Sequence, residues 1–383
     1  MSHSRSGALC SGATMLEFHA SAISGTEPVL CDELRELGFA SVRLNRGGVP
    51  FRGAWRDGWR ACLESRIAQR IHLLLARFPA ASPEALYAGV AAVDWSPYLT
   101  PDQTFAVRAV CMGSEVNHSG FAALKVKDAI VDSIRSRCGT RPSVAADPDV
   151  RIFLYLANDK AALYLDLSGE PLHRRGYRLD TGAAPLRETL AAAILRMAGW
   201  DRSTRLLDPL CGSGTIVIEA ALWAANIAPG LSRARFGFER WANFGQEEAL
   251  RLRELRGALR AACSGRAARI VAADADAAVL AKAQNNARMA GVKISFREQS
   301  IFSMQPDREP TLVITNPPYG VRIEKDPLFA RKAAAAFCRM HAWRVGLLVG
   351  TPDYARELSP RPIKQIPLVN GDLPCEFLLY DIP

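Results

Sequence analysis

Short apolar segments alternate with helical patterns through the second half of the chain, and this order constrains the fold more than any other feature. After residue 185 the apolar segments fall at residues 205–207, 269–273, 293–296, 311–315, 345–350 and 376–380. Strands that alternate with helices are typical of a doubly wound α/β sheet, in which parallel strands are covered by helices. The sequence therefore predicts a Rossmann-like α/β domain over residues 185–383.

The first part of the chain mixes strands and helices in a less regular order. Strand-like runs are expected at residues 15–23, 104–110, 150–156 and 161–167, a hairpin at 41–52, and helices at 26–37, 57–78 and 121–137. Such an order indicates α+β architecture. Residues 171–184 form a basic, glycine-containing linker, and residues 1–14 are expected to be a disordered tail.

Composition limits the class of protein without selecting one. Lys and Arg number 48 and Asp and Glu 39, and the net charge of +9 permits an anionic partner without requiring one. No run of apolar residues is long enough for a transmembrane helix. The nine cysteines form no CxxC pair and the six histidines no metal motif, so we expect free thiols in a reducing, cytoplasmic compartment and no metal site.

The strongest motif is the turn from Asp208 to Thr215, which follows an apolar strand and opens a helix. Its small residues let a ligand approach the backbone closely, and the start of a helix offers free N–H groups. The glycines do not have the GxGxxG spacing of a dinucleotide fold, and no GxxxxGK[ST] phosphate loop is present. The turn predicts a ligand site of another kind.

Two further motifs follow later strands. Asp274 ends the next strand, where an acidic residue commonly binds ribose hydroxyls, while Asp276 is better placed to cap the following helix. Residues 315–320 read Thr-Asn-Pro-Pro-Tyr-Gly. Two prolines remove N–H donors, so carbonyls and the Asn316 amide oxygen are left to accept hydrogen bonds from an exocyclic amine, and Tyr319 offers a ring on which a planar base can stack.

In this order, the three motifs resemble those of the THUMP-domain class I methyltransferases that modify the 2-amino group of guanine in RNA, above all the bacterial 23S rRNA guanine-N2 methyltransferases. The likeness extends over nearly the whole chain, through residues 25–28, 47–51, 125–132, 166–169, 173–178, 184–191 and 228–231. The chain resembles the form of the family that has one methyltransferase domain. Some members carry a second one at the C-terminus, which we expect this chain to lack.

The resemblance implies S-adenosylmethionine as cofactor and assigns roles to particular residues. The cofactor would be bound by Asp208, Pro209, Cys211, Gly212, Ser213, Gly214, Asp274 and Ser300, and the target base by Asn316, Pro317, Pro318 and Tyr319. Ser300 departs from the pattern, because the family usually has an acidic residue there that contacts the adenine amine. A hydroxyl or backbone contact would then recognise the adenine.

The resemblance also divides the N-terminal part into a ferredoxin-like segment, 15–80, and a THUMP domain, 81–170, that bind RNA. The expected RNA contacts are Lys125, Lys127, Arg174, Arg175 and Arg178, although the arginines of the linker could instead join the two domains. Arg233, Arg235 and Arg240 lie in an insertion, residues 228–265, and are expected to share the contact. Ribosomal RNA is favoured as the partner over transfer RNA.

Other functions stay open at this point. A tRNA guanine-N2 methyltransferase would have the same domains, and a non-catalytic RNA-binding factor of ribosome assembly could keep the fold without the cofactor. DNA adenine and protein glutamine methyltransferases use a similar Asn-Pro-Pro-Tyr motif, but the N-terminal segment argues against both. The sequence does not indicate the oligomeric state.

Overall fold

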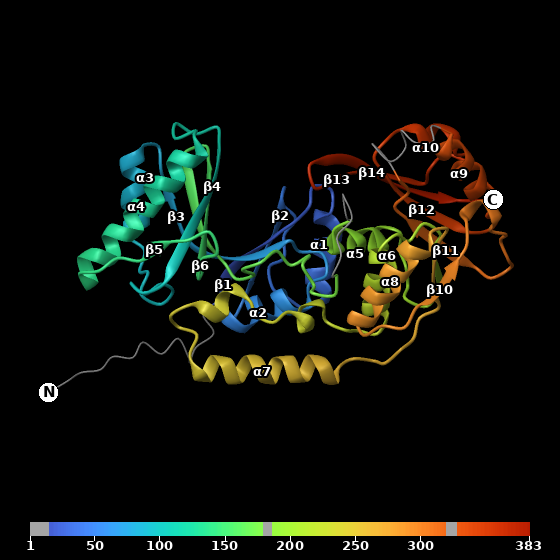
Figure 1. The fold of residues 1–383 in the computed structure, drawn as a ribbon. Helices are drawn as coiled ribbons and strands as arrows, with labels where there is room; N and C mark the ends of the chain where they lie inside the picture. Colours follow the sequence, from blue (N-terminus) through green and yellow to red (C-terminus); the bar gives the residue numbers. More distant parts are fainter. Residues whose placement is uncertain (1–14, 179–185, 319–327) are drawn as a thin grey trace.

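The computed structural model describes residues 15–178, 186–318 and 328–383, and it consists of two seven-stranded sheets with their helices (Figure 1). The predicted tail, residues 1–14, lies outside the described residues. No helix in the described ranges is both long and apolar enough to cross a membrane.

The N-terminal sheet has the strand order β2-β1-β3-β7-β6-β4-β5. Its strands are β1 (Leu16–Ser21), β2 (Gly48–Gly53), β3 (Arg70–Pro79), β4 (Thr104–Met112), β5 (Ser143–Val144), β6 (Val150–Ala157) and β7 (Lys160–Asp166). The helices are α1 (Glu27–Glu36), α2 (Trp55–Glu64), α3 (Pro83–Ala91) and α4 (Ser119–Cys138). Because β3 pairs with β7, one sheet runs across the expected boundary between the ferredoxin-like and THUMP segments.

The predicted helix over residues 57–78 is wrong. The helix α2 ends at Glu64, and β3 occupies most of the remainder. The carboxylate of Glu33 in α1 ends the helix, because it accepts hydrogen bonds from the Arg66 N–H (3.0 Å), the Ile67 N–H (3.3 Å) and the Ser65 hydroxyl (2.7 Å). A contact with a residue more than thirty positions away thus competes with the helical pattern.

The second sheet has the order β10-β9-β8-β11-β12-β14-β13, and its first five strands are parallel. The strands are β8 (Arg205–Asp208), β9 (Ile270–Asp274), β10 (Ser295–Glu298), β11 (Thr311–Thr315), β12 (Arg344–Val349), β13 (Lys364–Asn370) and β14 (Leu373–Asp381). The helices are α5 (Glu188–Met197), α6 (Thr215–Ala224), α8 (Ala277–Met289), α9 (Phe329–Cys338) and α10 (Asp353–Glu357). The alternating apolar segments therefore predicted every parallel strand, whereas the edge strand β13 was not predicted.

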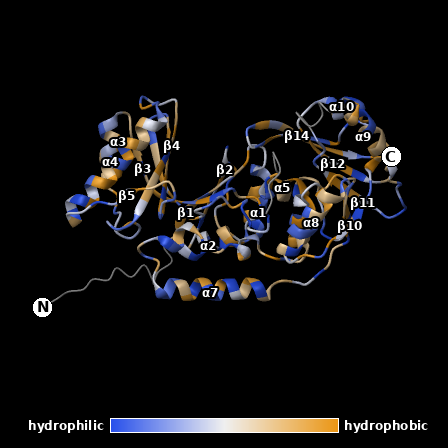
Figure 2. Ribbon diagram, viewed as in Figure 1, coloured by the Kyte–Doolittle hydropathy of each residue, from blue (hydrophilic) through white to orange (hydrophobic). Residues whose placement is uncertain are grey.

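The insertion between α6 and β9 packs against the N-terminal part. It contains two short 3-10 helices, η1 (Pro229–Ser232) and η2 (Gly237–Arg240), and the helix α7 (Gln246–Ala261). The segment η1 contacts both α2 and α7, and α7 is drawn below α2 in Figure 1. The rings of Phe238 and Trp59 stack with centroids 5.4 Å apart. Leu252 of α7 is buried in the same hydrophobic core as Trp59 and Phe238, and much of the helix is hydrophilic (Figure 2).

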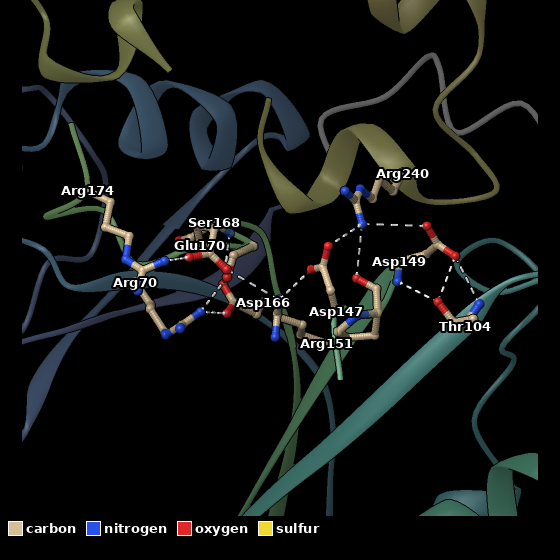
Figure 3. A network of polar contacts seen from close by, with 12 residues as sticks. Arg70, Thr104, Asp147, Asp149, Arg151, Asp166, Ser168, Glu170, Arg174 and Arg240 are labelled. Carbon is tan, nitrogen blue, oxygen red and sulfur yellow. Dashed lines mark hydrogen bonds and ion pairs between the residues drawn. The ribbon is translucent and has the colours of Figure 1, made fainter. Parts of the chain in front are cut away.

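A polar network joins the insertion to one end of the N-terminal sheet (Figure 3). Arg240 forms an ion pair with Asp149 (3.7 Å) and donates a hydrogen bond to the Pro148 carbonyl. Asp149 in turn accepts hydrogen bonds from Thr104 at the start of β4, and Arg70 of β3 pairs with Asp166 of β7. The two parts of the chain are therefore joined by both an aromatic core and charged side chains.

Candidate active site

The candidate site lies at the carboxyl ends of the parallel strands. The chain proceeds from β8 outward to β9 and β10, and then returns to place β11 on the other side of β8. Ligands of doubly wound sheets bind at such a reversal, because the loops on either side of it diverge. The strand pairing sets Leu207 beside Val313, so the segments beginning at Asp208 and Asn316 leave the sheet from neighbouring strands.

The turn between β8 and α6 has a backbone that suits a closely bound ligand. Gly212 and Gly214 have φ angles of +54° and +83°, which residues with a side chain rarely adopt. A Cβ atom at Gly212 would meet no other atom within 4 Å, so the space above this residue is open. At Gly214 the same atom would lie 3.1 Å from the Cβ of Ala283, so this glycine permits close packing on α8.

Two side chains of this turn are buried and have shifted pKa values. Burial raises the pKa of the Asp208 carboxyl to about 7, and the carboxyl accepts a hydrogen bond from the Leu210 N–H (3.2 Å). Burial also raises the pKa of the Cys211 thiol, which keeps it neutral and unsuited to act as a nucleophile. Pro209 is buried beside them, and Ser213 is partly exposed.

Asp274 at the end of β9 binds the same turn. Its carboxylate accepts hydrogen bonds from the Gly212 N–H (3.0 Å) and the Asp276 N–H (3.1 Å), and the residue remains partly exposed. The structure therefore brings Asp274 together with the glycine turn. Asp276 caps α8 through hydrogen bonds from the Ala278 and Val279 N–H groups, as predicted.

The sequence reasoning did not find Asn286. Its side-chain amide donates a hydrogen bond to the Ser213 carbonyl (3.0 Å) from α8, and the residue is buried. The available signal was a polar residue on the buried stripe of that helix, next to Ala283 and Ala287. Asn286 thus helps to fix the backbone of the turn.

Ser300 caps a short 3-10 helix, η3 (Ile301–Ser303), and is partly exposed. Its hydroxyl accepts a hydrogen bond from the Phe302 N–H (3.3 Å). A hydroxyl that accepts one hydrogen bond keeps its own hydrogen for donation. Ser300 can therefore offer a ligand a donor, whereas the acidic residue usual in the resembling family offers only acceptors.

The side chain of Asn316 has an unpaired oxygen. Its Oδ1 atom is buried and accepts no hydrogen bond from any of the described residues. Pro317 is buried and Pro318 is partly exposed. Tyr319, which was expected to stack on the base, lies outside the described residues. A buried acceptor without a donor is costly, and a bound amine would supply the missing hydrogen.

The linker arginines that were predicted to contact RNA differ in their surroundings. Arg175 is 2% exposed and donates hydrogen bonds to the Leu172 and Arg66 carbonyls. The side chain of Arg178 is 9% exposed and donates to the Thr215 hydroxyl (2.6 Å). Arg175 therefore ties the linker to the N-terminal part, and Arg178 fixes the linker to α6, which fits the alternative left open, that the linker arginines join the two domains. The Arg174 side chain is 68% exposed and pairs with Glu170.

The other predicted RNA contacts also divide into exposed and structural residues. Lys125 and Lys127 are partly exposed on α4, where Lys127 pairs with Asp128 (3.1 Å). Arg233 of the insertion is 8% exposed and donates hydrogen bonds to four main-chain carbonyls of residues 168–174. The expectation that it contacts RNA is therefore wrong, because its guanidinium is used to fix the linker. Arg240 is also engaged at the joint, and Arg235 is exposed.

Within the described ranges no group of His, Cys, Asp or Glu side chains is placed to hold a metal ion. The site thus consists of a glycine turn, two carboxylates and an amide oxygen at the reversal of the sheet. This arrangement suits a ligand bound along the strand ends and a second, amine-bearing group at Asn316.

Three family models match the chain. Residues 175–378 match the RMKL-like methyltransferase domain, residues 17–72 the RlmL ferredoxin-like domain, and residues 80–166 the THUMP domain. A ribosomal RNA large subunit methyltransferase K/L of Syntrophotalea carbinolica is 41% identical over 388 aligned residues, which cover 96% of this chain and 54% of that protein. The chain thus spans about half the length of the curated relatives it matches.

Solved structures resemble the whole chain. A predicted N6-adenine-specific DNA methylase from Listeria monocytogenes is 30% identical with a TM-score of 0.85, and the match covers 97% of each chain. SMU.472 complexed with SAH is 28% identical with a TM-score of 0.84, and the match covers 96% of this chain and 98% of that one.

Proposed function

The chain belongs to the RMKL-like methyltransferase domain family, and on this premise we propose that it is an S-adenosylmethionine-dependent RNA methyltransferase. The proposed acceptor is the exocyclic 2-amino group of a guanine in large-subunit ribosomal RNA. The observation that carries this proposal is the buried, unpaired Oδ1 atom of Asn316 at the reversal of the sheet. The proposed site of action is the cytoplasm.

The turn from Asp208 to Gly214 fits the proposed cofactor. The open space above Gly212 admits a ligand against the backbone, and the start of α6 provides free N–H groups. The Asp208 carboxyl suits the amino group of the methionine moiety, and the partly exposed Asp274 suits the ribose hydroxyls. The SAH bound to the similar SMU.472 structure supports this choice, since SAH is the product left when S-adenosylmethionine loses its methyl group.

The Asn316 segment fits the target amine. Two acceptors, the Asn316 Oδ1 atom and the Pro317 carbonyl, match the two hydrogens of an exocyclic amine, and Tyr319 would stack on the base. Fixing both hydrogens also fixes the direction of the nitrogen lone pair. When bound, the cofactor supplies a methyl group already activated by its positive sulfur. Positioning by this chain should therefore provide most of the acceleration.

The target guanine must leave its stack to reach Asn316, because its amine is otherwise engaged or shielded. The match of residues 80–166 to a THUMP domain and the name of the relative from Syntrophotalea carbinolica favour RNA, and ribosomal RNA in particular. The similar structure from Listeria monocytogenes is described as a predicted N6-adenine-specific DNA methylase, so DNA is included as a substrate in the test.

The test is replacement of the amide, Asn316→Ala, with Asn285→Ala as the matched control. Asn285 lies on α8, where it accepts a hydrogen bond from Arg288. We expect Asn316→Ala to lower methyl transfer by about 100-fold or more, as removal of one oriented hydrogen-bond partner does in other active sites. Binding of S-adenosylmethionine, measured by calorimetric titration, should remain, and the control should keep both properties.

The substrate is identified by mass spectrometry of nucleosides after reaction with protein-free ribosomal RNA, transfer RNA and DNA. N2-methylguanosine in ribosomal RNA is the expected product. Methyl transfer by Asn316→Ala at the wild-type rate would refute the assignment of the amide. Methylation of transfer RNA or DNA alone would refute ribosomal RNA as the substrate. Failure to bind S-adenosylmethionine at millimolar concentration would refute the assignment of the chain as an enzyme that uses this cofactor.

A further inference from the structure

One face of the N-terminal sheet is turned away from its helices. Side chains alternate between the two faces of a strand. On β1, β3, β6 and β7 one set is fully or almost fully buried with residues of α1, α2 and α4 in a single core, namely Phe18, Ile71, Leu73, Ile152, Leu154, Leu163 and Leu165. The alternate set therefore faces the other way, and we call that side the open face.

Aromatic side chains form a row across the open face. Tyr164 of β7 lies directly opposite Phe153 of β6, with ring centroids 6.2 Å apart. His72 of β3 lies 5.4 Å from Phe153 and 6.1 Å from Tyr164. Tyr155, two residues after Phe153, is 39% exposed. These four residues, which we call the aromatic row, come from three neighbouring strands, and all except His72 are at least partly exposed.

Arginines border the aromatic row. Arg108 of β4 lies opposite Phe153 and is exposed, with no carboxylate partner among residues 15–178, 186–318 and 328–383. At the other end, Arg77 and Arg52 both pair with Glu17, and their side chains are 54% and 51% exposed. The three arginines at the two ends, against the single carboxylate of Glu17, leave the border positively charged.

We propose that the open face binds a single-stranded segment of RNA, whose bases stack on the aromatic row while its phosphates contact Arg108 and Arg77. Sequence-tolerant binding of unpaired strands combines a positive border with exposed rings, since every base has a face that can stack. Both features are present here. An acidic partner without rings would match only the positive border, and a purely apolar partner would match only the exposed rings. The inference rests on the proposed function, because it takes RNA as the partner.

The test measures binding of a fluorescein-labelled RNA decamer to the full chain by fluorescence anisotropy. Tyr155→Leu removes the ring but keeps an apolar side chain, and Tyr155→Phe keeps the ring. Loss of one stacked base should weaken binding by about 5- to 150-fold in Tyr155→Leu. Tyr155→Phe should bind within about twofold of the wild type, because stacking needs the ring rather than the hydroxyl.

The charge is tested separately by the salt dependence of the same binding. Arg108→Gln should reduce the slope of log affinity against log salt by about 0.7, the value for one phosphate contact on a single strand. Arg356→Gln is the matched control, since this arginine of α10 is exposed far from the sheet in sequence and fold (Figure 1). Its slope should equal that of the wild type.

Each result bears on the proposal. Unchanged binding by Tyr155→Leu would overturn it and would leave the open face to a protein partner, and equal losses in Tyr155→Leu and Tyr155→Phe would overturn stacking. Equal affinity for a duplex of the same length would overturn the choice of a single strand. Failure of the proposed function is distinguishable, because it shows as absent methyl transfer by the wild type while the decamer still binds.

Discussion

We expect the buried carboxylate of Asp208 to favour cofactor binding and to lower the stability of the protein without cofactor. Its carboxyl lies fully buried at the end of β8, and burial raises its pKa from the ordinary value of 3.8 to about 7, with a further contribution from the charge of Asp274. A raised pKa means that the folded protein binds this proton more tightly than the unfolded chain does. Stability in the absence of the cofactor should therefore fall as the pH rises from about 4 to about 7.

The size of the effect follows from that pKa. A shift from 3.8 to about 7, at about 1.4 kcal/mol per unit, amounts to about 4 kcal/mol at pH 8 and to less than about 2 kcal/mol at pH 5. Asp208→Asn removes the charge, but its amide introduces N–H groups whose burial costs about 1–3 kcal/mol. We therefore expect the free energy of unfolding to rise by about 1–3 kcal/mol at pH 8, and to change little or to fall at pH 5.

The assay is calorimetric unfolding of the wild type and Asp208→Asn without cofactor at both pH values. At pH 8 the melting temperature of the methyltransferase part should rise by a few degrees in the variant. Titration with S-adenosylmethionine should show weaker binding, because a neutral amide replaces the carboxylate that we assign to the methionine amino group. A variant that is less stable than the wild type at pH 8, or equally shifted at both pH values, would refute the reasoning.

Two further substitutions test the packing around the site. Gly214→Ala should lower the free energy of unfolding by about 1–3 kcal/mol, because φ is +83° and the new Cβ would meet Ala283 at 3.1 Å; urea unfolding measures this, and an unchanged midpoint would contradict it. Arg175→Ala should cost about 3–5 kcal/mol, because it leaves the buried Glu219, 3.6 Å away, without its cation. Arg174→Ala is the exposed control and should change stability by less than about 0.5 kcal/mol; equal losses in both variants would show that burial does not separate them.

Motifs at strand ends were predictable because they depend on short stretches of chain. Asp208, Asp274 and Asn316 were selected as candidates because each lies at or just after the end of an apolar strand, where ligands of a parallel sheet bind. Their meeting at one edge followed from the parallel sheet. Asn286 was missed, because its partner is the Ser213 carbonyl and nothing near residue 286 in the sequence indicates that contact.

Positive charge in the sequence was less informative about which residues contact a ligand than the motifs at strand ends were. Arg174 and Arg175 are neighbours in a basic linker, yet one is exposed and the other is fully enclosed by carbonyls and Glu219. The insertion shows the same division, since Arg235 is exposed and Arg233 is buried. An arginine can neutralise a phosphate or satisfy buried carbonyls with the same five N–H groups, so residue type alone does not separate the two uses.

The sequence by itself determined the doubly wound domain, its family resemblance and the residues at its strand ends, because hydrophobic alternation and turn chemistry are local properties. The tertiary structure decided where α2 ends, which arginines are available to RNA, and that the insertion packs against the N-terminal part. It also decided that residues from three strands form the aromatic row on the open face. These features depend on contacts between distant segments, and burial of a side chain is fixed only when those segments pack together.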